Sequence, residues 1–256
     1  SVGWTHHIAE TPWTVGLGMY GVGGYRVNYF PSANNPIATP QPPNGFGLGR
    51  IYGELEVFQV APTLSYALTE HVSIGMAPTL NLAKLAATPL FLAAPDDANG
   101  DGFPSYPSGL GTRYHWGGGA QLGVYYTPAM NWHFGASLKS PQWFEPFRFM
   151  TANDLGGPRL VKIDIDYPMI LSIGASYTGL PNLLLACDVR YFDYKNTAGF
   201  RQAGFAADGA GLGLGWRNIV TVSTGAQYTV SKHLYARAGN SYQQNPISGA
   251  NTVFNV

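Results

Sequence analysis

A few charged residues stand at alternate positions between apolar or small neighbours. Asp188 and Arg190 lie two residues apart, and the same setting recurs at Lys139, Lys162 and Arg237. Successive side chains of a strand point to opposite faces, so such charges would be held on one face. An Arg or Lys on that face could bind a carboxylate ligand. Alternatively, the cations neutralise nearby acids, for which the candidates are Asp164, Asp166 and Asp188.

Aromatic side chains are concentrated in one segment that otherwise resembles a loop, residues 140–158. They are Trp143, Phe144, Phe147 and Phe149. Pockets for hydrophobic ligands are lined mainly by apolar and aromatic groups, so this segment could collect such a ligand. The same residues could instead belong to an aromatic belt at a membrane interface and to ordinary loop packing.

Two further patterns carry weaker signals. Asp97, Asn99 and Asp101 place oxygen ligands as in the first half of a calcium loop, but the twelfth position is Ser108 instead of Glu. A simple Asx turn is the alternative, and we expect no metal site. His133 and Ser137 are four residues apart on one strand, too far for a hydrogen bond without a neighbour's help. We therefore predict no enzyme activity and no cofactor.

The elements that would carry these residues show a two-residue alternation, clearest between residues 220 and 230. One face has Val220, Val222, Ala226, Tyr228 and Val230, and the other has Thr221, Ser223, Gly225, Gln227 and Thr229. A soluble β-sandwich, the lesser alternative, would put Lys, Glu and Arg on its polar face. Small uncharged polar residues are typical of the lumenal face of a transmembrane barrel.

Composition supports a barrel in the outer membrane. Only 11% of residues are charged, whereas soluble domains average about 25%. The net charge is zero, which argues against a nucleic-acid partner. No apolar run reaches the ~18 residues of a transmembrane helix. The single Cys187 falls on an apolar face, and we interpret it as a small hydrophobic residue.

The pattern along the chain predicts an all-β, up-and-down antiparallel barrel with about nine strands visible. Short turns alternate with long loops near residues 30–49, 86–111, 140–158 and 195–215, as in outer-membrane barrels. Residues 1–256 form one partial barrel domain, and residues 245–256 are a loop, which implies that closing strands are missing. We expect strands over residues 13–25, 51–67, 72–82, 116–127, 132–139, 161–178, 183–194, 216–230 and 233–242.

Several stretches resemble the FadL/TodX family of outer-membrane channels for long-chain fatty acids and other hydrophobic compounds. They are APTLSY (61–66), HVSIG (71–75), GASLKSP (135–141), DVRYFDY (188–194), GAQY (225–228), LYARAG (234–239) and NPI (245–247). The resemblance implies a fourteen-stranded barrel with an N-terminal plug and a sideways opening into the membrane. The chain departs from this pattern because we find no plug before Trp13 and no final strands.

The resemblance implies passive uptake of a hydrophobic small molecule, by capture on extracellular loops, lumenal binding and lateral release into outer-membrane lipid. A monomer is expected. The alternative is a barrel that acts as an adhesin or receptor through its long loops, without transport. A transporter should have an apolar lumenal pocket with one or two basic groups, whereas the lumen of an adhesin should be filled.

Overall fold

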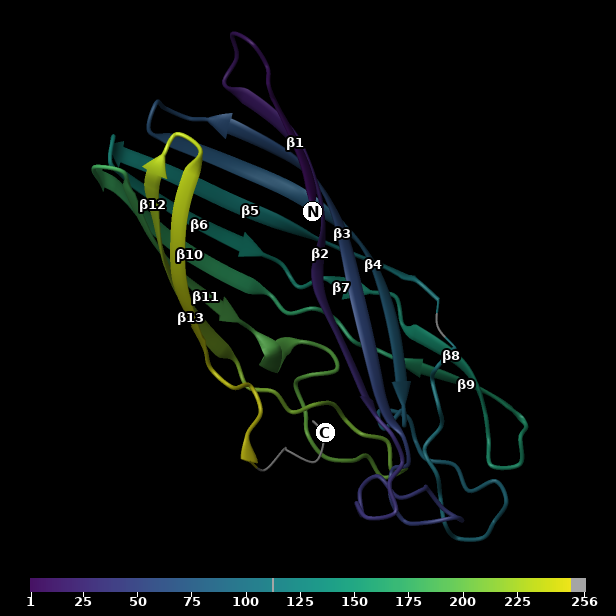
Figure 1. The fold of residues 1–256 in the computed structure, drawn as a ribbon. Coiled ribbons are helices and arrows are strands. Elements are labelled where there is room, and N and C mark those ends of the chain that lie inside the picture. The colour runs from purple at the N-terminus through teal and green to yellow at the C-terminus, as the bar shows by residue number, and fades with distance from the viewer. Residues whose placement is uncertain (112, 250–256) are drawn as a thin grey trace.

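The computed structural model of the protein describes residues 1–111 and 113–249. One long antiparallel sheet curves into a trough, with β1 and β13 at its two edges (Figure 1). Its strands are β1 (Val2–His7), β2 (Trp13–Tyr29), β3 (Ile51–Ala67), β4 (Val72–Thr88), β5 (His115–Ala129), β6 (Trp132–Lys139), β10 (Ile170–Leu180), β11 (Leu183–Phe192), β12 (Ile219–Ser231) and β13 (Leu234–Gln243). Each strand pairs with its neighbour in that order.

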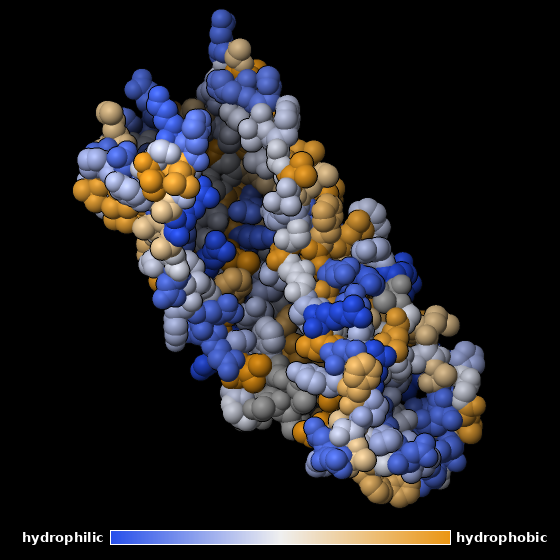
Figure 2. All heavy atoms as spheres, viewed as in Figure 1, coloured by the Kyte–Doolittle hydropathy of each residue, from blue (hydrophilic) through white to orange (hydrophobic). Residues whose placement is uncertain are grey.

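The predicted alternation is confirmed by the register of the sheet. One rung that crosses eight strands is apolar throughout: Val222, Val189, Ile173, Ala136, Val124, Ile74, Tyr66 and Trp13. The next rung faces the other way and is small or polar at most positions: Ser223, Asp188, Gly174, Gly135, Tyr125 and Ser73. Hydrophilic side chains line much of the hollow in Figure 2, so the polar face is the lumenal face.

Each of the nine predicted strands has a counterpart in this sheet, although the one predicted over residues 161–178 is represented there only by β10, and β1 is an additional strand. No strand was predicted before Trp13, but residues 2–7 pair with β2 from Val2↔Met19 to His7↔Thr14. Strand β4 also continues past its predicted end at Leu82, as far as Thr88. Its extension contains Lys84, so the apolar alternation ends before the hydrogen-bonded ladder does.

Two predictions about the segment between β6 and β10 are wrong. Residues 140–158 are more than a loop, because they contain β7 (Trp143–Phe144), β8 (Phe147–Ala152) and the start of β9 (Pro158–Ile163). The strand predicted over residues 161–178 is interrupted, because β9 ends at Ile163 and β10 begins at Ile170. Between them lies Pro168, which has no N–H to donate to a ladder. Period-two alternation alone does not distinguish a wall strand from a hairpin inserted beside it.

The β8–β9 hairpin forms a separate two-stranded sheet that packs on the lumenal face of β3 and β4. Its apolar side chains meet those of the wall in the main hydrophobic core, which comprises Val57, Ala83, Leu85, Leu90, Ala93, Phe147, Phe149, Val161 and Ile163. The hairpin therefore fills part of the lumen near the long-loop end of the trough.

The long connections gather at one end of the trough, and the short turns at the other (Figure 1). Gln41, in the β2–β3 connection, exchanges hydrogen bonds with the backbone of Tyr106, whose hydroxyl donates to the carbonyl of Gly209. The 3-10 helix η1 (Tyr194–Asn196) begins the β11–β12 connection. Within the described residues no helix is long and apolar enough to cross a bilayer. The part of the predicted C-terminal loop beyond residue 249 lies outside them.

Candidate functional site

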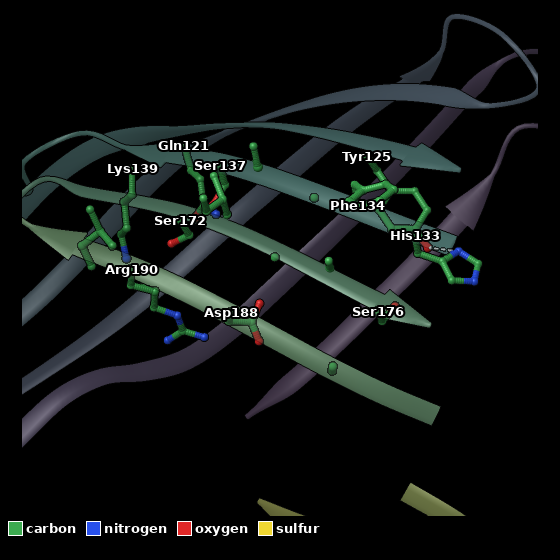
Figure 3. Close-up of a pocket in the computed structure, with 17 residues that line it drawn as sticks. Gln121, Tyr125, His133, Phe134, Ser137, Lys139, Ser172, Ser176, Asp188 and Arg190 are labelled. Atoms are coloured by element: carbon green, nitrogen blue, oxygen red, sulfur yellow. Dashed lines mark hydrogen bonds between the residues drawn. The ribbon is translucent and has the colours of Figure 1, made fainter. Parts of the chain in front are cut away.

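A groove of about 540 Å³ runs along the lumenal face of β5, β6, β10 and β11. Figure 3 shows its polar side chains, which come from alternate positions of the four strands. Those that could contact a ligand through polar atoms are Gln121, His133, Ser137, Lys139, Ser172, Ser176, Asp188 and Arg190. Three of the predicted lumenal residues, Lys139, Asp188 and Arg190, therefore share one site.

The three charged groups of the groove are held in different ways. Lys139 is 9% exposed, and its Nζ donates to Gln59 Oε1 at 2.6 Å across the lumenal face. Asp188 lies beside Gly174, where an added Cβ would stand 2.3 Å from Asp188 Oδ1, so the glycine leaves room for the carboxylate. Arg190 is exposed toward the groove.

The expected neutralisation of these cations by neighbouring acids is not observed. In residues 1–111 and 113–249 the two ion pairs within 4 Å join Lys84 to Glu54 and Arg113 to Glu145. Arg190 is thus free of a carboxylate partner in this range, although Asp188 lies two residues before it on the same face. The groove carries two cations and one anion, and none of them forms an ion pair with another residue that the structure describes.

A buried polar cluster lies next to Lys139, on the side of the long loops. Gln142 Oε1 accepts hydrogen bonds from Thr79 Oγ1 at 2.5 Å and from Asn81 Nδ2 at 2.7 Å. Gln142 is 1% exposed, and its amide fills the space beside Gly119, where a Cβ would come within 2.4 Å of Gln142 Nε2. The cluster fixes the chain inside the lumen where β6 ends and the segment leading to the β8–β9 hairpin begins. We did not predict it, although Thr79 and Asn81 stand on the predicted polar face of β4.

Two other predicted lumenal residues lie outside the groove. Lys162 belongs to β9, opposite Arg148 in the inserted hairpin, and is exposed. Its placement on a wall strand is therefore wrong, because β9 pairs with β8 in the inserted hairpin and does not join the wall sheet. Arg237 is on the lumenal face of β13, but its Nε donates to Gln227 Oε1 at 2.6 Å, and it stands over the Tyr235 ring.

The aromatic segment is not an exposed collecting surface as a whole. Phe147 and Phe149 are each 1% exposed in the hydrophobic core, so the prediction is wrong for them. Phe144 lies partly buried over Gly117, where a Cβ would meet its ring at 2.4 Å. Trp143 pairs with outward-facing Gly118 and is 56% exposed, a position typical of an aromatic belt.

The remaining candidates have local partners. In the Asp97–Asp101 turn, Asp97 Oδ1 accepts from the Gly102 amide, and Asn99 Oδ1 accepts from the Asp101 amide, as in an Asx turn. No group of three His, Cys, Asp or Glu side chains suited to a metal occurs in the described part of the chain. His133 Nδ1 shares a hydrogen bond with the Tyr125 hydroxyl at 3.0 Å.

The antiparallel strands form a trough with an apolar outer face and a polar lumenal groove, and the connections are long at one end and short at the other. These features define the wall of a β-barrel channel of the outer-membrane type. The chain belongs to the family of outer membrane protein transport proteins (OMPP1/FadL/TodX), whose family model matches residues 47–256. Members are non-enzymatic channels for hydrophobic compounds in the bacterial outer membrane. Curated proteins yielded no match to the chain.

Solved structures of the same fold confirm the architecture. The Ralstonia pickettii toluene transporter TbuX is 19% identical, with a TM-score of 0.70, and the match covers 94% of this chain and 68% of that one. The Pseudomonas putida toluene transporter TodX is 16% identical, with a TM-score of 0.66, and the match covers 94% of this chain and 67% of that one. A Pseudomonas aeruginosa FadL homologue is 15% identical, with a TM-score of 0.67, and the match covers 97% of this chain and 60% of that one. The chain thus spans about two thirds of these barrels.

Proposed function

We propose that the channel takes up long-chain fatty acids or similar amphipathic compounds, and that their carboxylate binds in the lumenal groove. The observation that carries this proposal is Arg190, an exposed guanidinium that lines the groove and has no carboxylate partner within the described residues. A guanidinium can bind a carboxylate through two parallel hydrogen bonds, which makes it the stronger candidate of the two cations.

The rest of the groove fits one anionic headgroup. Ser172 faces Arg190 directly across the β10–β11 pair, so a hydroxyl stands beside the guanidinium. Lys139 lies on the next strand, opposite Ile170, and adds a second positive charge that is already bonded to Gln59. Asp188 repels an anion from the other side, which would direct the carboxylate toward Arg190. Toluene, the compound for which the transporters TbuX and TodX are named, has no group that needs this arginine.

The substrate would pass in three steps: capture on extracellular loops, binding in the lumen and lateral release into the bilayer. Because Phe147 and Phe149 are buried and Trp143 faces outward, first contact would fall to exposed aromatic side chains of the long connections, such as Phe46 and Phe103. The groove is an intermediate site between these residues and the bilayer. The movement is downhill and needs no cofactor.

Binding of a radiolabelled long-chain fatty acid to the full-length protein in detergent tests the proposal. We expect Arg190→Ala to weaken saturable binding by at least about ten-fold, because a charge-assisted hydrogen bond contributes about 1.5–3 kcal/mol. Arg190→Lys should recover part of the loss, since it keeps the charge and loses the bidentate geometry.

Arg237→Ala is the matched comparison, because Arg237 faces the lumen from β13 outside the groove. Unchanged binding in this variant, together with weakened binding in Arg190→Ala, would support the groove. Weakening in Arg237→Ala alone would move the headgroup site to β13. If neither substitution weakens binding of the fatty acid while toluene competes with it equally, the carboxylate proposal fails.

A further inference from the structure

A group of charged residues lies on the outward face of the barrel, beyond the apolar band. On β4 the outward side chains from Val72 to Leu82 are apolar over 11 residues, and a tilted strand needs about 9–11 residues to cross the hydrocarbon layer. The next outward residue is Lys84. The strands continue beyond it, so the residues that follow lie at the level of the lipid headgroups.

Neighbouring strands place further charges at this level. Lys84 pairs with Glu56 of β3, and two residues farther along Glu54 pairs with Arg26 of β2. Arg26 faces outward because the β-bulge between Gly21 and Gly23 shifts the register of β2 by one residue. Without the bulge, Arg26 would point into the lumen.

Two arginines stand over one tyrosine ring in this region. The Cζ atom of Arg50 is 4.9 Å from the centroid of the Tyr52 ring, and the Cζ atom of Arg26 is 5.6 Å from it. Such cation–π contacts hold guanidinium groups in place while leaving their N–H donors available. Arg50 Nε donates to Asn28 Oδ1 at 3.0 Å, which further fixes its orientation.

The acidic residues nearby are largely committed to other partners. Glu54 accepts from Lys84 Nζ at 3.1 Å and from the Tyr52 hydroxyl. Over residues 1–111 and 113–249, neither Arg26 nor Arg50 has a carboxylate within 4 Å. Glu56 is exposed and is the acid that most opposes an incoming anion.

We propose that Arg26 and Arg50 bind the phosphorylated headgroup of a lipid in the outer leaflet. Long loops of outer-membrane barrels are extracellular, so this end of the strands meets the outer leaflet. Guanidinium groups match phosphate geometry, and cations at the headgroup level are attracted to anionic lipid. The apolar band below them, with Phe58 and Leu82 nearest, contacts the acyl chains of the same lipid.

Native mass spectrometry of the full-length protein in detergent tests this site, with a bisphosphorylated glycolipid and its dephosphorylated form as probes. Each cation near an anionic lipid surface contributes about five-fold in affinity. We therefore expect the double variant R26Q/R50Q to bind the phosphorylated lipid about 25-fold more weakly. The matched control K232Q removes one positive charge from the β12–β13 turn at the opposite end, and should stay within two-fold of the wild type.

Two further variants keep the test decisive if the double variant folds poorly. R26K/R50K keeps both charges and should retain most of the affinity. Glu56→Gln removes the opposing negative charge and should tighten binding by about five-fold. Fatty-acid binding in the lumen should be unchanged in all of these variants, which separates this site from the proposed transport function. Equal binding of the two lipids, or equal binding by R26Q/R50Q and the wild type, would overturn the proposal.

Discussion

Replacement of Gln142 by Ala should loosen the polar cluster that holds the inserted segment in the lumen. The substitution removes the acceptor of two hydrogen bonds, from Thr79 Oγ1 at 2.5 Å and Asn81 Nδ2 at 2.7 Å. It also removes the bond from Gln142 Nε2 to the carbonyl of Ser140 at 2.9 Å. Thr79 and Asn81 are 2% and 0% exposed, so their donors would remain buried without this partner.

The size of the destabilisation follows from the two donors, Thr79 Oγ1 and Asn81 Nδ2, that lose their acceptor. A buried donor left unsatisfied costs about 1–3 kcal/mol, which gives about 2–6 kcal/mol for the pair. The vacated amide leaves a polar space large enough for a water, and a water there would satisfy part of the loss. We therefore expect the free energy of unfolding to fall by about 2–3 kcal/mol.

Urea unfolding of the protein in lipid vesicles, followed by tryptophan fluorescence, measures this loss. Gln202→Ala removes the same side chain from an exposed loop position and should change the unfolding free energy by less than about 0.5 kcal/mol. If Gln142→Ala is no more destabilising than this control, the cluster does not hold the segment in place.

A repacked variant separates hydrogen bonding from packing. Replacement of all partners by apolar residues of similar shape can be nearly neutral. The triple variant Thr79→Val, Asn81→Leu and Gln142→Leu should therefore be more stable than Gln142→Leu alone, by at least about 1 kcal/mol. The opposite order would show that the loss comes from side-chain volume.

Two further predictions concern pH and topology. The hydrogen bond from the Trp116 amide, and then the charge of Arg113, lower the pKa of Glu145 from its usual 4.5. The ionised Glu145 carboxylate therefore stabilises the folded protein above pH 4.5, and this contribution is lost as the pH falls through the lowered pKa. Urea midpoints between pH 7 and pH 3 should fall more in the wild type than in Glu145→Gln, and parallel curves would contradict the reasoning. Cys187 is exposed on the outward, lipid-facing side, so in vesicles an apolar maleimide should label it at least about ten-fold faster than a charged thiol reagent. Ser172→Cys on the lumenal face, in a Cys187→Ser background, should reverse that preference, and equal labelling would show that the faces are misassigned.

The sequence by itself determined the wall of the barrel and the orientation of its side chains. Period-two alternation is a local property, so Val222 could be placed outward and Asp188 inward without knowledge of any partner strand. The low content of charged residues then identified lipid as the medium outside. Clustering of Lys139, Asp188 and Arg190 followed in part, because all three lie on the lumenal face and only β10 separates β6, which carries Lys139, from β11, which carries the other two.

Only the tertiary structure decided which segments fill the lumen. Phe147, Phe149 and Val161 alternate with polar neighbours as a wall strand would, yet they form a hairpin packed inside the trough. The bonds of Gln142 to Thr79 and Asn81 join residues more than 60 positions apart, and no local pattern encodes such a contact. The outward position of Arg26 depends on a single bulge, because one inserted residue reverses every face that follows it.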